Sequence, residues 1–271
     1  MIDLCVVNYN SRKELQRLLD VLHSDLNGPN GALVKEWNLY ITDNDSKDDS
    51  IDWLRENEEK YLIERTFLRK NIGYSAAANM MVANSKSDIV AILNADVWFT
   101  SSDIIKIQNL FDENPDMHIF GPKQRDEHGF ITHAGIVGTN TSPKHRGWKE
   151  HDPSDILYKD RVECVTVSGS AYFVRRDVWN DLTNHPKYRE MYPNATGAFL
   201  PTPHYYEETW CSYFARHLGY NVFYDGSISI GHSWHASSPK PGEGYSHADA
   251  QFPVSREIFR KACDYIGIER D

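Results

Sequence analysis

The sequence predicts an α/β fold with a mostly parallel, Rossmann-like central sheet flanked by helices. Over residues 1–115, short apolar runs alternate with amphipathic stretches that have a helical period. Strand–helix–strand units of this kind connect through right-handed crossovers, which place successive strands parallel in one sheet. Further along, short apolar runs follow one another with turns between them, which indicates a mixed second half.

The first half contains the clearest elements. Strands are expected at residues 4–7, 37–42, 62–68 and 89–93, where each apolar run is short. Helices are expected at residues 12–26, through 51–54, at 75–85 and up to 111. Ser11 with Glu14 would form a capping box, Ser46 or Asp48 would cap the second helix, and Ser101 or Ser102 the fourth.

The second half carries shorter elements. Strands are expected at residues 118–122, 130–137, 162–167, 171–174, 222–224 and 227–230, and helices at 177–182, 207–218 and 252–265. Residues 125–129 are expected to turn, residues 140–153 to form a mobile loop and residues 239–244 a flexible loop. The first loop contains a basic run at 144–149, which would close over a ligand or remain solvated.

Composition excludes several classes of protein. The chain has 271 residues, of which 40% are hydrophobic and 25% charged, as in a globular protein. Its net charge of -10 repels phosphate backbones and argues against general nucleic-acid binding. No apolar stretch approaches the ~20 residues of a membrane span, and the N-terminus lacks the features of a signal peptide.

The four cysteines also bear on location. They are far apart in the sequence and fit no C-x-x-C spacing, so we expect buried free thiols in a reducing compartment. We therefore expect a cytoplasmic protein, either free or peripheral at a membrane. With no repeat or clear linker, residues 1–271 are expected to form a single domain.

Polar clusters follow three expected strands, at residues 8–10, 43–46 and 94–96. Ligands of open parallel sheets bind beyond the carboxyl ends of the strands, where these clusters would meet. Asp96 would be costly if buried and unpaired, so it is either an exposed turn residue or a ligand for a hard cation that bridges phosphates. Taken alone, it favours the turn.

Four segments in order resemble family 2 glycosyltransferases of the GT-A fold, particularly the rhamnosyltransferase-like branch. They are Val-Val-Asn-Tyr-Asn at 6–10, the Asp-Asn-x-Ser-x-Asp-x-Ser loop at 43–50, Asn-Ile-Gly-Tyr and its helix at 71–79, and Ile-Leu-Asn-Ala-Asp at 92–96. The resemblance covers roughly residues 2–232. It implies a nucleotide-sugar-binding half at 1–115, an acceptor and catalytic half at 116–235, and a flexible loop with a C-terminal helix at 236–271.

The resemblance also implies the donor site. Tyr9 and Asp43 would recognise the base of a UDP- or dTDP-sugar. The rest of the expected pocket consists of Asn10, Asn44, Asn71, Gly73, Asn79, Asn94, Ala95 and Asp96, with Gly169 in a small-residue turn beneath the sugar. From the residues alone, Asp43 fits an Asx-turn equally, Gly73 an ordinary loop glycine, Asn79 a helix residue bonded to a loop, and Gly169 a tight β-turn.

The metal site departs from the family pattern, because Asn94 replaces the first aspartate of the commoner Asp-x-Asp motif. Asp96 would therefore be the main carboxylate ligand of Mn²⁺ or Mg²⁺. His232 is the expected second ligand, with His235 in reserve; the alternatives for His232 are a residue that binds the diphosphate and an ordinary loop histidine.

The catalytic base is expected at the start of the helix at 207–218. Glu208 stands where the family has its catalytic aspartate, with Glu207 as a close rival, and Trp210 replaces a second aspartate. Enrichment of glutamate in a first helical turn is the structural alternative.

The sequence thus predicts an inverting glycosyltransferase acting on an acceptor hydroxyl of a glycan, lipid, protein or small molecule. Two alternatives remain open: a carbohydrate-binding protein that has lost activity, which the departures at Asn94 and Trp210 permit, and a nucleotidyltransferase. The second is weaker, because residues 8–12 hold no glycine-rich loop.

Overall fold

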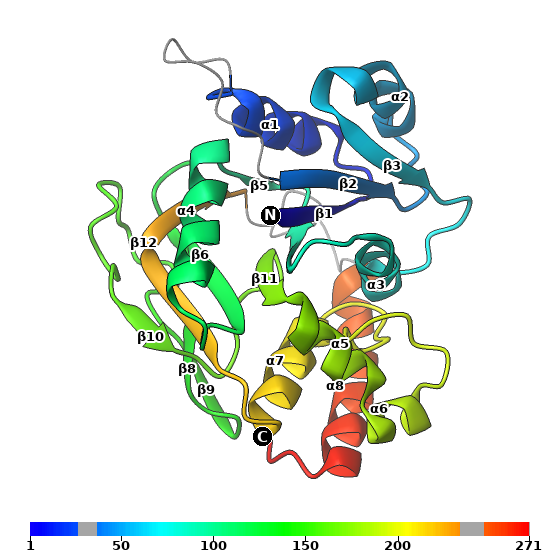
Figure 1. The fold of residues 1–271 in the computed structure, drawn as a ribbon, viewed down its shortest axis with the longest axis vertical. Helices are drawn as coiled ribbons and strands as arrows, with labels where there is room; N and C mark the ends of the chain where they lie inside the picture. The colour runs from blue at the N-terminus through cyan, green and yellow to red at the C-terminus, as the bar shows by residue number, and fades with distance from the viewer. Residues whose placement is uncertain (27–36, 234–246, 271) are drawn as a thin grey trace.

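The computed structural model describes residues 1–26, 37–233 and 247–270, the last without the side chains of 247–249. One sheet runs through the molecule in the order β10-β12-β6-β11-β4-β1-β2-β3 (Figure 1). Its strands are β1 Ile2–Asn8, β2 Trp37–Asp43, β3 Ile63–Phe67, β4 Ile89–Asn94, β6 Ile119–Arg125, β10 Arg161–Glu163, β11 Ala171–Arg175 and β12 Val222–His232.

The predicted fold class is confirmed, with a parallel half and a mixed half. Strands β3, β2, β1 and β4 are parallel, β11 is antiparallel to both β4 and β6, and β12 is parallel to β6. Two short strands lie outside this order: β5, Val97–Trp98, pairs with β12, and β7, Ile131–His133, pairs with β6. The carboxyl ends of β1, β2, β4 and β12 consequently meet at one edge.

Helices cover both faces of the sheet. They are α1 Arg12–His23, α2 Ser50–Tyr61, α3 Tyr74–Asn84, α4 Ser101–Glu113, α5 Arg176–Asn184, α6 Pro186–Met191, α7 Glu207–His217 and α8 His247–Ile266. Figure 1 shows α1 and α2 on one side, with α3 and α5 to α8 on the other. Alternate residues of β1 point to opposite faces, so Leu4 packs in the core with α1 while Cys5 packs in the core with α3.

The structure differs from the sequence predictions at the helix starts. Ser11 does not cap α1, because its hydroxyl donates to the Tyr9 carbonyl, and α1 ends at His23 rather than at residue 26. Asp49, rather than Ser46 or Asp48, precedes α2. The predicted caps of the fourth helix are also wrong.

The fourth helix, α4, begins after Thr100, which forms a capping box with Asp103. The Asp25 carboxylate accepts hydrogen bonds from the amides of Ser101 and Ser102, the two residues expected to cap it. The sequence pattern placed the start of this helix correctly to within a residue, but three consecutive hydroxyl side chains left the capping residue ambiguous.

The second half differs more. Residues 140–153 are not one loop, since β9, Ser142–His145, pairs with β8, Ile136–Thr139. The two strands expected at 222–230 form one strand, β12, with a register shift between Asp225 and Ser229. The turn at 125–129 is present, but β5 and α6 were not predicted, and the loop expected at 239–244 lies outside the described residues.

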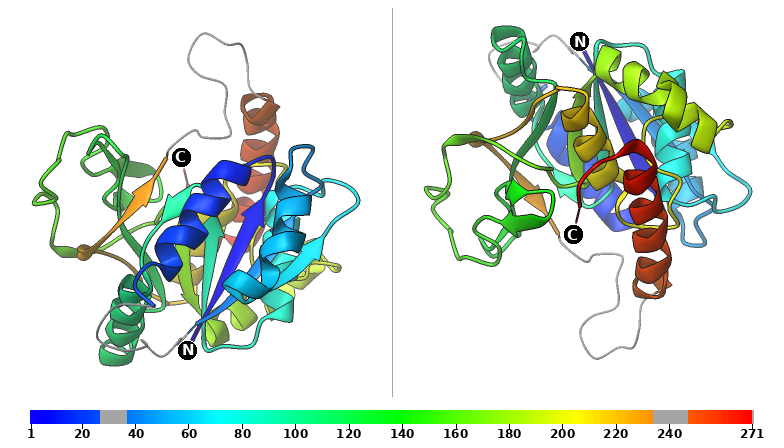
Figure 2. Two further views of the ribbon diagram at one scale, coloured as in Figure 1. Left: turned by 90° about the horizontal axis from the view of Figure 1, so that it is seen from above. Right: turned by 90° about the horizontal axis from the view of Figure 1, so that it is seen from below.

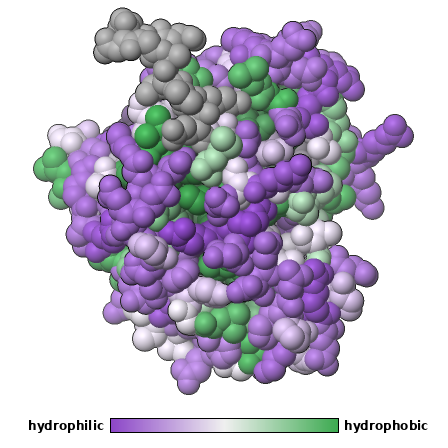
Figure 3. Space-filling model, viewed as in Figure 1, coloured by the Kyte–Doolittle hydropathy of each residue, from purple (hydrophilic) through white to green (hydrophobic). Residues whose placement is uncertain are grey.

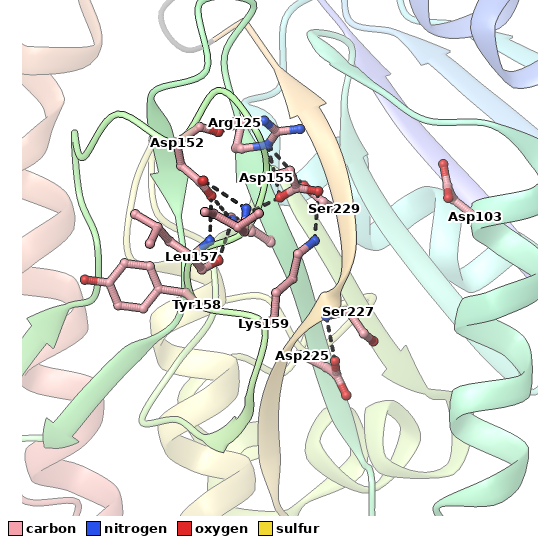
Figure 4. Close-up of polar contacts among 12 residues, drawn as sticks. Asp103, Arg125, Asp152, Asp155, Leu157, Tyr158, Lys159, Asp225, Ser227 and Ser229 are labelled. Atoms are coloured by element: carbon pink, nitrogen blue, oxygen red, sulfur yellow. Dashed lines mark hydrogen bonds and ion pairs between the residues drawn. The ribbon is translucent and has the colours of Figure 1, made fainter.

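The β8–β9 hairpin and the chain after it form a lobe at the β12 side of the sheet, away from β2 and β3 (Figure 2). A buried ion cluster holds this lobe. Lys123 of β6 is fully buried and contacts Asp152, Asp155 and the Leu157 carbonyl. Figure 4 shows Asp152 and Asp155 turned toward the same polar cluster, with Arg125 beside them. Burial opposes ionisation, but bonds from Lys123 and two backbone amides hold the pKa of Asp152 below its usual value.

The surface agrees with the composition. The face seen in Figure 1 is mostly hydrophilic, with apolar residues scattered over it (Figure 3). All four cysteines are free and buried, as predicted. No helix within the described ranges combines the length and the apolar character that crossing a membrane requires.

We expect Lys123→Met to lower the free energy of unfolding by about 3–5 kcal/mol, because it leaves the buried Asp152 carboxylate without its cation. Lys106→Met is the matched control, since the Lys106–Asp103 pair is exposed and worth less than about 1 kcal/mol. Urea denaturation of both variants measures the difference, and equal losses would show that the buried cluster does not stabilise the lobe.

Candidate active site

A cavity of about 290 Å³ lies at the edge where the strand ends meet. Its lining residues come from four places. These are the ends of β4 and β12 with the start of α3, the 168–170 turn, the chain before and at the start of α7, and strands β7 to β9 with the chain just after them. The lining residues are Tyr74, Asn94, Asp96, Thr132, His133, Ile136, His145, Trp148, Ser168, Gly169, Ser170, His204, Tyr205, Glu207, Glu208 and His232. The structure therefore brings together Asp96, His232, Gly169 and both glutamates. A larger cavity of about 510 Å³, beside Arg17 and Arg125, contains none of the predicted site residues.

Asp96 and His232 meet because of the short strand β5. Directly after Asp96, β5 pairs antiparallel with the end of β12, so that Val97 lies opposite His232. The Ser233 amide donates to the Asp96 carbonyl at 2.9 Å, which extends the pairing. The Asp96 Oδ1 and His232 Nε2 atoms are 3.6 Å apart, and both side chains are less than one-tenth exposed.

The packing of Trp98 fixes this pairing. A Cβ at Gly231 would lie 1.7 Å from Trp98 Cε2, so only glycine lets the indole cross β12 here. On the other side of the indole, the Arg17 guanidinium lies 3.5 Å from its ring centroid. The position of His232 thus depends on Gly231 and Trp98, neither of which lines this cavity.

Among the described residues, no cluster of three or more histidine, cysteine, aspartate or glutamate side chains is placed to hold a metal ion. Asp96 and His232 offer one carboxylate and one imidazole, a donor set that suits Mn²⁺ or Mg²⁺ when substrate oxygens and water complete the shell. This pair fits a metal that binds together with a diphosphate.

Glu207 and Glu208 begin α7, after two tyrosines in the left-handed region: Tyr205 and Tyr206 both have φ 70°. Glu207 is buried and accepts a bond from the Thr202 hydroxyl at 3.3 Å. Glu208 is half-buried and packs on Gly169, where a Cβ would lie 3.1 Å from Glu208 Cγ.

The two carboxyls are hard to ionise together. Burial raises the pKa of Glu207, and the charge of Glu208 raises it further. Burial likewise raises the pKa of Glu208 above the ordinary glutamate value. A carboxylate whose pKa is raised toward neutral pH is a stronger proton acceptor, which suits general-base chemistry.

The 168–170 turn lies in the cavity wall between Asp96 on one side and Glu207 and Glu208 on the other. The Asn94 amide donates to the Ser170 carbonyl at 2.9 Å, and the Ser170 hydroxyl donates to Gln124 at 2.7 Å. Asn94 itself borders the cavity, while Ala95 is buried beneath it. Gly169 was expected either in a tight β-turn or in a turn beneath the sugar. The two expectations are compatible, because the turn brings the backbone of Gly169 against Glu208.

The expected base-binding residues lie at neighbouring strand ends rather than in the cavity wall. Tyr9 is exposed. Asp43 is fully buried, and its oxygens accept bonds from the Asn8 side chain at 2.7 Å and the Ser46 amide at 2.8 Å. These contacts are those of the turn alternative for Asp43. Asn10 joins the same network through its bond from the Lys47 amide.

Asn44, in the loop after β2, is joined by hydrogen bonds to the loop of Asn71 and Gly73 that precedes α3. The Asn44 side chain bonds Asn71 and the Ile72 amide, and Asn71 accepts from the Gly73 amide at 2.9 Å. Gly73 has φ 84°, which requires a glycine for the sharp entry into α3. Asn79 is buried and bonds the backbone of Phe199, so it matches the helix-to-loop alternative.

Sequence reasoning did not place His133 of β7 or His145 of β9 in the site, although both line the cavity. His133 is buried, and burial, with His145 and His232 nearby, lowers its pKa to about 3, so its ring is neutral. His145 belongs to the run expected as a basic loop, where Arg146 instead pairs with Asp160, away from the cavity. The signal available was the histidine and tryptophan content of that run. His235 lies outside the described residues.

Solved structures of several known proteins are similar in fold to this chain. TarS from S. aureus, residues 1–349 with UDP-GlcNAc, has a TM-score of 0.60 at 12% identity over 100% of this chain and 68% of that chain. GalNAc-T7 with UDP, GalNAc and Mn²⁺ gives 0.64 at 14% over 98% and 50%. Mannosyltransferase PcManGT from Pyrobaculum calidifontis with GDP-Man and Mn²⁺ gives 0.58 at 11% over 98% and 74%.

These structures are similar to this chain in fold, which is the GT-A glycosyltransferase fold. The chain spans 66% of the length of a free TarS fragment and 36% of a longer TarS chain. No curated protein sequence matches it. The model of glycosyl transferase family 2 matches residues 3–183, so the chain belongs to this family. The rhamnosyltransferase-like branch stays a prediction.

We expect Gly231→Ala to unfold or displace the β5–β12 pair, because the added Cβ meets the Trp98 ring rather than a flexible side chain. Inside a strand, alanine is ordinarily the more stable residue by roughly 0.5–1 kcal/mol, so a loss of stability in Gly231→Ala would come from the contact with the ring. Gly219→Ala is the comparison for backbone strain without a clash: its φ of 89° should cost alanine about 1–2 kcal/mol, but no atom lies within 4 Å of the added Cβ. Thermal unfolding of both variants tests this, and equal losses would mean that the steric contact is unimportant.

Proposed function

We propose that this family 2 glycosyltransferase moves a sugar, with inversion, from a UDP- or dTDP-sugar to an acceptor hydroxyl. One observation carries the proposal: the Asp96–His232 pair and Glu208 line the same cavity. The similar structures support a nucleotide-sugar donor, since TarS is in complex with UDP-GlcNAc and PcManGT with GDP-Man and Mn²⁺, while GalNAc-T7 is with UDP, GalNAc and Mn²⁺.

Asp96 and His232 would hold Mn²⁺ or Mg²⁺ together with the donor. The metal, when bound, would neutralise the diphosphate leaving group. The need for it follows from the described cavity lining, which includes no lysine or arginine that could take this part. Asn94 adds hydrogen bonding but no charge, so Asp96 is the single carboxylate ligand.

Glu208 would act as the general base. Its carboxylate takes the proton of the acceptor hydroxyl while that oxygen forms a bond to the anomeric carbon. The bond from this carbon to the phosphate oxygen breaks on the opposite face, and the nucleoside diphosphate leaves with the electron pair. Greater exposure and its place over Gly169 favour Glu208 over Glu207, whose carboxyl is buried against Thr202.

The donor base would bind beside Tyr9, Asn10, Asn44, Asn71 and Gly73, at the strand ends next to the cavity. Asp43 would read the base only if its buried carboxylate became accessible. Asn79 would support the pocket from behind through its Phe199 contacts. Residues 1–115 thus serve the donor and residues 116–235 the acceptor, whose class (glycan, lipid, protein or small molecule) the cavity leaves open. We place the enzyme in the cytoplasm or at a membrane periphery.

The alternative of a protein that has lost activity is weaker. Trp210, one of the departures that permitted it, is fully buried and packs on Tyr188 and Phe214, so its replacement of an acidic residue serves the core. Both glutamates and Asp96 are present in one cavity. A nucleotidyltransferase gains no support, because the residues after β1 form no glycine-rich phosphate loop.

A screen of UDP-, dTDP- and GDP-sugars by calorimetry should find one donor that binds only with Mn²⁺ or Mg²⁺. Asp96→Asn should weaken that binding by more than about ten-fold, or 1.4 kcal/mol, because it removes the carboxylate ligand. Asp112→Asn, at an exposed site on α4, should leave it unchanged. Metal-independent binding, or none to any donor, would refute the metal-assisted mechanism.

Glu208→Gln should lower kcat by about 10²-fold or more while donor affinity is kept, since an amide accepts no proton. Glu207→Gln should cost far less. In the wild type, kcat/KM should fall as the pH drops through the raised pKa of Glu208, above the usual value of 4.5, because only the ionised base works. Near-normal turnover of Glu208→Gln would transfer the role to Glu207.

A further inference from the structure

Tyr74 lies in the cavity wall together with Asp96, Glu207 and Glu208. It is the first residue of α3, directly after Gly73. Its hydroxyl donates to the Gly169 carbonyl at 3.2 Å, a contact between the donor half and the 168–170 turn. Its ring is stacked with the Phe199 ring, with the two ring centroids 6.5 Å apart, and this contact limits the rotation of the side chain.

The turn that Tyr74 holds is also the surface on which Glu208 rests. Gly169 leaves no space between its backbone and the Glu208 side chain, as the 3.1 Å approach of a Cβ to Cγ and 3.2 Å to Cδ show. The same turn is bonded to Asn94 at the end of β4. A shift of the Gly169 carbonyl would therefore move the Glu208 carboxyl relative to Asp96.

Tyr74 is suited to this contact because it remains a donor. Burial, then the negative charges of Glu207, Glu208 and Asp96, raise the pKa of Tyr74 well above its ordinary value. The hydroxyl thus keeps its proton at neutral pH. Its backbone is anchored too, because the preceding turn is closed by the Asn71 bond to Gly73.

We propose that Tyr74 is a positioning residue that sets the Glu208 carboxyl relative to the donor site by holding the Gly169 carbonyl. The inference rests on Glu208 being the base of the proposed reaction. Tyr74 itself moves no proton and touches no reacting atom. It links the loop that carries Asn71 to the base on α7, so donor-side geometry and base geometry are fixed by one hydrogen bond.

The test compares Tyr74→Phe with Tyr188→Phe. Tyr188 is the matched control, since it is fully buried, its hydroxyl bonds the carbonyls of Gly197 and Phe199, and it lies outside the cavity wall. With the donor found by the screen, Tyr74→Phe should lower kcat about ten-fold, with donor affinity within about two-fold of wild type. Tyr188→Phe should lower only the melting temperature.

A second measurement does not depend on turnover. In protein labelled with carboxyl ¹³C-glutamate, Tyr74→Phe should shift the pH midpoint of the Glu208 resonance, identified by its loss in Glu208→Gln, while Tyr188→Phe should not. An unchanged midpoint, or equal kcat losses in the two tyrosine variants, overturns the positioning role. If no donor binds the wild type, the proposed function fails, and the midpoint alone decides the inference.

Discussion

The pairing of β5 with the end of β12 is the contact on which the active site depends. It occupies two residues on each strand, yet it brings together the ends of the two halves of the sheet. Asp96 follows β4 and His232 ends the last strand, and neither would meet the other without this pairing. The pairing in turn requires Gly231, because the Trp98 ring takes the volume of a side chain there. The Asp96–His232 pair is therefore set by sheet geometry and by one aromatic contact.

The parallel half was predictable because its signals are local. Strands β1 and β4 are short, buried apolar runs, β3 alternates in burial, and α1 has a buried face of four leucines, so period and length identify them. The mixed half was less predictable. Strand β5 has two residues, β9 carries a proline and two basic side chains, and the β12 bulge interrupts the pattern of one strand. In each case the pairing partner, not the sequence of the element, determines the strand.

The candidate site shows the same division. Asp96, Gly169, Glu207, Glu208 and His232 were found from motifs in order, and one cavity holds them. Asp43 and Asn79 satisfy local and tertiary hydrogen bonds that motif order does not reveal. Tyr74 belongs to the segment at 71–79, but its bond to the Gly169 carbonyl is not visible in the sequence, and neither is the cavity that His133 lines. A motif predicts which residues gather at an edge, but it does not predict how each polar atom is satisfied.

The antiparallel strand β11 has a consequence for how the chain folds. It lies between β4 and β6 and pairs with both. Of the described strands, β6 pairs only with ones that follow it in the sequence, which are β7, β11 and β12. During synthesis the first four strands can assemble early, but the apolar edge of β4 stays unpaired until β11 emerges. Such an edge invites pairing with other chains. The order of strands thus makes the growing polypeptide most prone to aggregation midway, when half of the sheet is formed and its centre is still an edge.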